Sequence, residues 1–158
     1  MKEFMPLFAS IVTGTITLIA VLLTQKGNKK VQKDLLEIQM ERDEMKERRK
    51  ELIETLEVYN RILKVNGESN VIIDNGGAPE EFNFNVYQKE VRPILYEKYH
   101  LLHDEVAKIV TDMDSVIGYI YFSGGDNRTE HMNLSNKYNK LIENIEQKIR
   151  DFRKGDRS

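Results

Sequence analysis

The pattern of apolar and polar positions divides the chain into an uncharged N-terminal stretch and a long, polar, helix-patterned remainder. The stretch from Phe4 to Thr24 contains no charged residue over twenty-one positions. At about 1.5 Å per residue, a helix of this length matches the ~30 Å hydrocarbon core of a bilayer. Pro6 lies in its first turn, where a missing N–H does little harm. The pattern therefore predicts a transmembrane anchor over residues 1–25, with Gly14 near its middle.

Basic residues follow this stretch before the first acidic residue, Asp34. They are Lys26, Lys29, Lys30 and Lys33. A cleaved signal peptide ends in a small-x-small cleavage site, whereas this apolar run ends in Leu22-Leu23-Thr24-Gln25. A signal peptide and a buried core helix remain the alternatives. The lysines favour a positive-inside orientation. We expect a single-pass anchor in the cell membrane, with the N-terminus outside, the C-terminal domain in the cytoplasm and the lipid bilayer as a partner.

After the lysines, apolar residues recur with the seven-residue period of coiled-coil helices. Residues 26–50 are expected to form a charged juxtamembrane helix or stalk that continues into the bundle to about residue 65. One heptad row is apolar throughout and holds Ile38, Met45, Leu52 and Tyr59. The other holds two arginines, since it runs Leu35, Arg42, Arg49, Leu56 and Leu63. Either this segment is a solvated helix, or its arginines set the register or oligomeric state of a coiled coil.

The remainder, residues 51–158, is expected to form a helical bundle. Glycine, asparagine and proline clusters mark residues 66–85 as a loop. Two further heptad-patterned helices are predicted over about 86–122 and 129–154, with Pro93 ending or kinking the first of them. The fold class expected is therefore all-α: one N-terminal transmembrane helix followed by an antiparallel three-helix bundle with coiled-coil-like heptads.

An up-down-up order of three helices places the end of the second one on the membrane side of the bundle. Three aromatic residues gather there, namely Tyr119, Tyr121 and Phe122. Aromatic side chains are enriched at lipid–water interfaces. They also cap the ends of helical cores, so an interfacial cluster and a core cap are the two interpretations.

The amino-acid composition excludes some kinds of function and favours others. The chain has no cysteine, which excludes disulfide scaffolds and thiolate chemistry. A formal net charge of −2 gives no support for nucleic acid as a partner. Charged residues make up 32 % and aromatic residues 8 %, a balance that suits long solvated helices better than a deep catalytic pocket. The lysine- and asparagine-rich composition suggests a bacterial or phage origin.

One cluster of metal-ligating residue types stands out in the sequence. Glu97, His100 and Asp104 are spaced i, i+3, i+7, which would place them on one face of a continuous helix. A di-iron bundle needs a second Glu-x-x-His and further glutamates, and the sequence has no second copy. We therefore expect no metal, no cofactor and no catalytic residue.

These observations predict a membrane-anchored helical protein that acts through protein–protein contacts, as a scaffold, assembly factor or accessory subunit, and not as an enzyme. Its protein partner is not identified by the sequence, and a second copy of the chain is one candidate. The alternative function is a small membrane-active oligomer, such as a holin-like protein, a pore or a toxin component. A membrane-bound enzyme built on Glu97, His100 and Asp104 is a third hypothesis.

Overall fold

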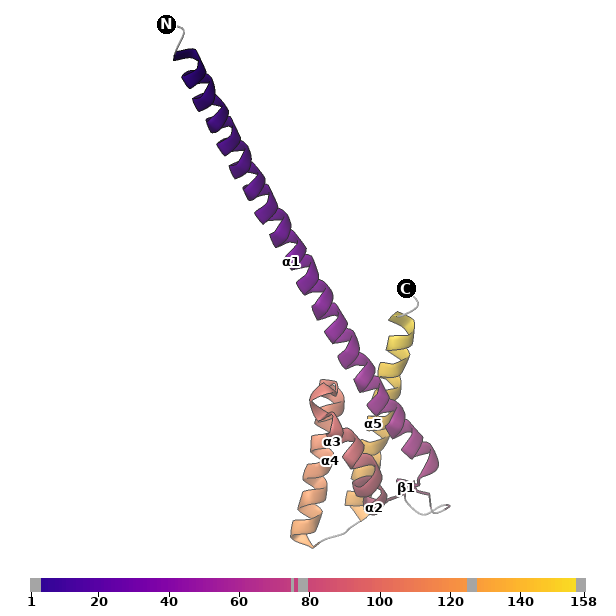
Figure 1. The fold of residues 1–158 in the computed structure, drawn as a ribbon. Helices are drawn as coiled ribbons and strands as arrows, with labels where there is room; N and C mark the ends of the chain where they lie inside the picture. The colour runs from indigo at the N-terminus through magenta and orange to yellow at the C-terminus, as the bar shows by residue number, and fades with distance from the viewer. Residues whose placement is uncertain (1–3, 75, 77–79, 125–127, 156–158) are drawn as a thin grey trace. The chain divides into compact units, whose positions relative to one another are not determined.

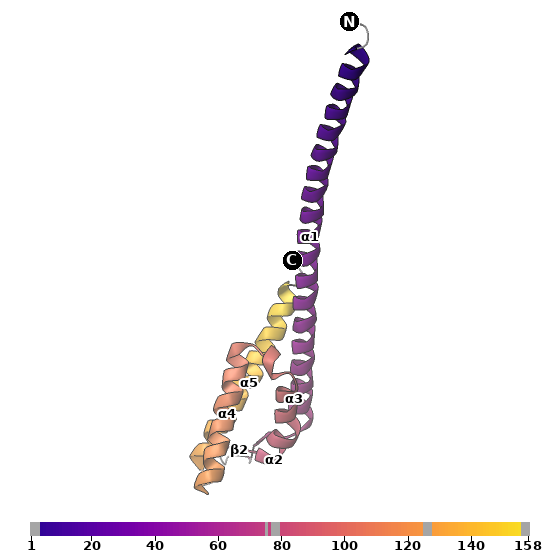
Figure 2. The same ribbon diagram turned by 60° about the vertical axis from the view of Figure 1, so that its left-hand side comes forward.

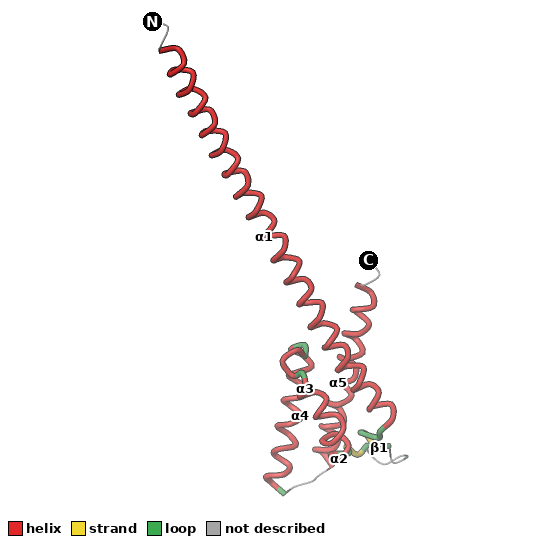
Figure 3. The backbone as a smooth tube through the Cα atoms, viewed as in Figure 1, coloured by secondary structure: helices red, strands yellow, loops and turns green. Residues whose placement is uncertain are grey.

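The computed structural model describes residues 4–74, 76, 80–124 and 128–155, and places most of them in helices (Figure 1). Coloured by secondary structure, the chain shows helices almost throughout, with two very short strands (Figure 3). The prediction of a mostly helical, all-α fold is therefore confirmed.

The first helix, α1, extends over Phe4–Glu68 without a break. Its contacts divide the chain into two compact units, Met1–Arg48 and Arg49–Ser158, which are called unit 1 and unit 2 below. Unit 1 is a single helix, and its side chains from Val21 onward are exposed. Unit 2 contains the final turns of α1 together with all the other elements.

The structure does not support the predicted membrane span. No helix in the part of the chain that the structure describes is long and apolar enough to cross a bilayer. Thr24 is exposed, while the side chains of residues 4–17, 19 and 20, and with them the predictions on Phe4 and Gly14, lie outside the described residues.

After α1, unit 2 contains a short hairpin and several further helices. A two-stranded antiparallel hairpin comes first, with Ile72 opposite Phe82. Figures 1 and 2 both show α4 and α5 lying side by side. The bounds of the elements are β1 Ile72–Ile73, β2 Glu81–Phe82, α2 Phe84–Val86, η1 Tyr87–Val91, α3 Arg92–Glu97, η2 Tyr99–Leu101, α4 Asp104–Ser123 and α5 Arg128–Gly155.

A wide turn accommodates Pro93, which the sequence predicted would end or kink a helix. Because proline has no N–H, it cannot donate the hydrogen bond that an α-helix needs at this point. The residues before it form the π-helical turn η1, in which the N–H of Arg92 reaches the carbonyl of Tyr87, five residues back. A π turn absorbs such a mismatch within a helix. The chain therefore continues through Pro93 into α3.

The predicted single helix over 86–122 is wrong, because the chain reverses direction within it. Helix α3 ends at Glu97, and Leu102 and His103 have extended backbone with ψ angles of 142° and 145°. Helix α4 then begins at Asp104, with an acidic first turn that suits a helix N-terminus. Unit 2 thus has four helical passes where the sequence predicted an antiparallel three-helix bundle.

Side chains from α1 bind the backbone groups that this reversal leaves without helical partners. The hydroxyl of Thr55 shares its one proton between the carbonyls of Leu101, at 3.1 Å, and Glu51, at 2.8 Å. The backbone N–H of His103 donates to the hydroxyl of Tyr59, also at 3.1 Å. Both α1 side chains are buried. Since buried backbone groups are costly to leave unpaired, these two contacts make the reversal compatible with a packed core.

One hydrophobic core fills unit 2 and draws on every helical pass. An aromatic group lies at its centre, where Phe82, Tyr87 and Tyr138 have ring centroids 5.5–6.4 Å apart. The fully buried apolar side chains around it include Ile62, Val71, Val91, Leu95, Val106, Val110, Met113, Leu134, Leu141 and Ile145. The hairpin therefore closes the core and is part of the fold, although the sequence predicted only a loop there.

Candidate functional site

The structure does not bring the predicted metal-ligating residues together. Glu97 is the last residue of α3, His100 lies in η2, and Asp104 opens α4. Their i, i+3, i+7 spacing therefore does not place them on one helix face, because the chain reverses between them. Glu97 instead pairs with Arg61 of α1. Among the described residues, no group of three or more histidine and acidic side chains is arranged to hold a metal ion.

The strongest candidate site is the cluster of aromatic side chains at the end of α4. We call it the aromatic end and define it as Tyr119, Tyr121 and Phe122. The exposed fractions of these residues are 62 %, 65 % and 92 %. Large aromatic side chains with this exposure are uncommon on a surface that contacts nothing but water, and they are enriched in protein–protein interfaces.

The exposure of the aromatic end follows from the helical period of α4. Met113, Ile117 and Ile120 are buried against the core, and this fixes the rotation of the last turns. Tyr119 and Phe122 are three residues apart and therefore share a face that is turned away from the buried one. The helix thus presents two large rings to solvent as a direct result of burying Ile120.

The aromatic end is held in a defined position. Gly124 ends α4 in a left-handed conformation with φ of 63°, and its N–H donates to the carbonyl of Ile120. The hydroxyl of Tyr121 donates to Gln88 of η1 at 3.3 Å. A shallow hollow beside it is lined by Phe84, Ile120, Tyr121 and Gly124. These contacts fix the backbone that carries the exposed rings.

The aromatic end lies at the opposite end of unit 2 from the place that the sequence predicted. The reversal between α3 and α4 packs on Tyr59, on the part of α1 that enters the unit. At the other end, Phe82 of the hairpin donates its N–H to Nδ1 of His131 at 3.0 Å, early in α5. The extra helical pass causes this difference, because it inverts the direction in which α4 runs. The expected position on the side where α1 enters is therefore wrong, while interfacial contact with lipid stays a prediction.

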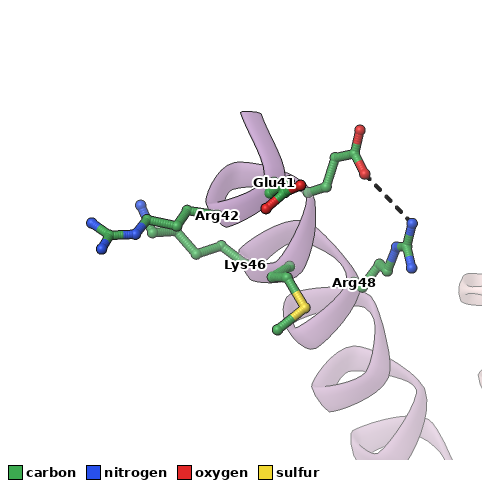
Figure 4. Close-up of a pocket in the computed structure, with 6 residues that line it drawn as sticks. Glu41, Arg42, Lys46 and Arg48 are labelled. Carbon is green, nitrogen blue, oxygen red and sulfur yellow. Dashed lines mark ion pairs between the residues drawn. The ribbon is translucent and has the colours of Figure 1, made fainter. Parts of the chain in front are cut away.

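Unit 1 presents a different surface. The predicted flanking residues Lys26, Lys29, Lys30 and Lys33 are all exposed along α1. Several large apolar side chains on the same helix are about half exposed or more: Val31, Leu35, Leu36, Ile38, Met40 and Met45. A hollow on this helix is lined by Glu41, Arg42, Glu44, Met45, Lys46 and Arg48 (Figure 4). Arg48 pairs with Glu44 at 3.5 Å, as the dashed line shows.

Comparison with known proteins gives no family assignment. No protein-family model matches the chain. No curated protein matches its sequence, and no solved structure matches its fold.

Proposed function

We propose that this protein is a non-catalytic scaffold or accessory subunit, anchored in a membrane by its N-terminal segment, which binds a partner protein through the aromatic end of unit 2. The observation that carries this proposal is the exposure of Tyr119, Tyr121 and Phe122. Burying an aromatic side chain in an interface contributes more binding energy than burying most other residues. An exposed aromatic group of this size is therefore suited to contact a partner.

The backbone around the aromatic end favours such binding. Association costs free energy when loops and side chains must become ordered. Here the rings are carried by a capped helix that packs on α5, and Tyr121 is further held by its bond to Gln88. Little ordering is needed when a partner binds, so more of the contact energy appears as affinity.

The membrane anchor in this proposal rests on the sequence. Phe4 to Thr24 are uncharged, and the lysines that follow are accessible on α1. Each lysine near an anionic leaflet contributes about 1 kcal/mol of attraction. We propose that the N-terminus lies outside, that the lysines lie at the cytoplasmic surface, and that unit 2 acts in the cytoplasm.

Photo-crosslinking in membranes tests the contact. A photoreactive residue in place of Phe122 should capture a partner protein, and Tyr119→Ala combined with Phe122→Ala should abolish its copurification. Ile53→Ala is the matched control, because Ile53 is an exposed apolar side chain of unit 2 on α1. Capture that persists unchanged in the double variant would contradict the proposal.

A second experiment separates the anchor from the contact. The full chain should float with liposomes and resist alkaline extraction, whereas a chain that starts at Asp34 should stay in solution. Overexpression that collapses the membrane potential would instead favour the alternative, a membrane-active oligomer. Full-length chain that is released by alkali would contradict the anchor without affecting the aromatic contact.

A further inference from the structure

An uncovered row of apolar side chains runs along unit 1. Its members are spaced alternately four and three residues apart, at Val31, Leu35 and Ile38, and Met45 follows seven residues after Ile38. Their exposed fractions are between 48 % and 70 %. This spacing is the heptad repeat, with Leu35 at position a and the other three at position d. Leu52 and Tyr59 continue position d, and in unit 2 that position is used for internal packing.

The hollow at Met45 lies along this row. Of its lining residues, Glu41, Arg42, Met45 and Lys46 occupy heptad positions g, a, d and e. These four positions flank the seam of a two-stranded coiled coil, where a side chain of one helix inserts between those of the other. Figure 4 shows Arg42 and Lys46 extending from the same side of the helix. The hollow therefore borders the seam positions, and its lining also includes Glu44 at position c and Arg48 at position g.

The charges beside the row match those of a second, parallel copy in the same register. In that arrangement each g residue lies opposite the e residue five positions later in the other chain. Glu41 then lies opposite Lys46, with opposite charges, and Asp34 lies opposite the neutral Gln39. Neither of these pairs sets like charges against each other. Among the described residues 28–48, the ion pairs are Lys46 with Asp43 at 3.1 Å and Arg48 with Glu44 at 3.5 Å. Lys46 therefore exchanges Asp43 of its own helix for Glu41 of the other copy when the two helices pair.

We propose that residues 28–48 of α1 pair with the same residues of a second copy of this chain, as a parallel, in-register, two-stranded coiled coil. The parallel direction rests on the proposed function, because two anchors inserted from the same side start both helices at one membrane. The pairing covers the apolar row, which a solitary helix leaves in water.

Polar residues at position a limit the assembly to two strands. Asn28 and Arg42 occupy this position. A polar residue in the a row fixes register and oligomeric state. In a dimer the long side chain of Arg42 can leave the seam and reach the Glu41 carboxylate of the other copy, while its stem stays on apolar surface. A third strand would enclose the guanidinium group, which carries a large desolvation penalty.

Cysteine crosslinking of the full chain in detergent micelles and in liposomes tests the arrangement. The chain has no cysteine, so each variant carries a single thiol. Val31→Cys lies in the seam and should form an interchain disulfide roughly ten or more times faster than Lys33→Cys, its control on the opposite face. Equal rates would overturn the proposal. A dimer in which Val31→Cys fails to crosslink would also overturn it, because the helices would then be antiparallel or out of register.

Light scattering and sedimentation of the full chain in detergent test the seam in a second way. The wild type should be a dimer, and Ile38→Lys should raise its dissociation constant by roughly a hundredfold or more. Met40→Lys is the matched control, because Met40 is exposed to 59 %, against 48 % for Ile38, but lies outside the a and d rows. A monomeric or trimeric wild type, or equal effects of the two variants, would overturn the proposal.

Exchanging the charges at positions 41 and 46 tests whether a second copy of the chain covers the apolar row. Glu41→Lys should weaken the dimer, and adding Lys46→Glu should restore it, because the attraction between chains is then reversed in sign. Failure to restore would overturn the predicted pairing. Liposome flotation of the same samples reports on the anchor separately, so loss of dimer with intact flotation refutes the coiled coil and leaves the proposed function standing.

Discussion

Three buried tyrosine side chains illustrate how differently one residue type is used in this core. The Tyr59 hydroxyl accepts the His103 backbone N–H and shares a further hydrogen bond with Nδ1 of the same residue at 2.8 Å. Burial raises the pKa of Tyr59 to about 12, so the side chain stays neutral. Among the described residues, the buried hydroxyls of Tyr87 and Tyr138 have no hydrogen-bond partner. Burial raises the pKa of both above the ordinary tyrosine value.

Removing these hydroxyls should therefore have opposite effects on stability. Tyr59→Phe leaves the His103 N–H buried without an acceptor, and we expect a loss of about 1–3 kcal/mol. Tyr138→Phe removes an unpaired buried hydroxyl and keeps the ring, so we expect stability to stay level or rise by up to about 1 kcal/mol. Urea unfolding of the two variants beside wild type measures both. Equal losses would contradict the hydrogen-bond assignment.

Because His103 lies at the reversal between α3 and α4, the stability of the folded protein should depend on the protonation of this residue. Burial first, and then the nearby Lys148 charge, lower its pKa below the ordinary value, despite the opposing charges of Glu105 and Asp104. The folded protein therefore favours neutral His103, while the unfolded chain takes up a proton near pH 6.5. Stability from this group is present above that pH and is lost as pH falls through it towards the lowered pKa of the folded state.

The expected result is a stability that declines between about pH 7 and pH 5. In His103→Gln, which has no titrating ring, the decline over this range should be smaller. Thermal unfolding measured in steps of pH compares the two chains directly. Glu54, whose pKa is lowered mainly by its hydrogen bond and ion pair with Lys98, loses its contribution only at more acidic pH, so it does not interfere. Parallel pH profiles would contradict the role of His103.

At the scale of the elements, the sequence predicted the faces of the helices better than their ends. Val106, Met113 and Ile120 follow one another at seven-residue intervals, as the predicted heptad pattern requires, and all three are buried. The end of α3 was missed, because Leu95, Tyr99, Leu102 and Val106 keep the heptad spacing straight through the reversal. The chain can turn there because side chains of α1, distant in the sequence, form hydrogen bonds with its backbone. A local sequence pattern cannot predict such long-range bonds.

The end of α4, at Ser123 with Gly124 as its C-cap, provides a matched test of backbone conformation. Gly124 has a φ of +63°, which an L-residue adopts at a cost of about 1–2 kcal/mol. Gly118 lies inside the same helix, and a methyl group added there meets no atom within 4 Å. Gly124→Ala should therefore destabilise the protein, while Gly118→Ala should stabilise it by up to about 1 kcal/mol. Chemical unfolding compares them, and changes of the same sign would contradict this account.

At the scale of the whole molecule, the sequence suggested Tyr119, Tyr121 and Phe122 as an interfacial cluster, a role that stays a prediction, and it mispredicted their location in unit 2. Tyr119, Tyr121 and Phe122 can be identified in the sequence as aromatic residues just before Ser123-Gly124-Gly125. Their place in unit 2 depends on the number of helical passes, and one missed reversal moved the site from one end of the unit to the other. Side-chain periodicity carries little information about topology, since each helix keeps its pattern whichever way it runs.

The division into two units leads to a prediction about which part of the chain folds alone. Four buried apolar side chains of the core come from α1: Leu56, Val58, Tyr59 and Ile62. Their burial contributes on the order of 10 kcal/mol, which is comparable to the whole stability of a small domain. The last turns of α1 are therefore an essential part of unit 2, even though residues 21–48 of the same helix are exposed.

A fragment that starts at Arg49 should unfold cooperatively on heating, with helix content that matches its share of the full chain. A fragment that starts at Val71 lacks the four α1 side chains and Thr55, and with Thr55 and Tyr59 it loses the two groups that bind the backbone at the reversal between α3 and α4. We expect this shorter fragment to lose cooperative unfolding and chemical-shift dispersion. Circular dichroism and two-dimensional NMR distinguish the two outcomes. Cooperative folding of the shorter fragment would mean that α4, α5 and the hairpin form a core without α1, which would contradict the role assigned here to the final turns of that helix.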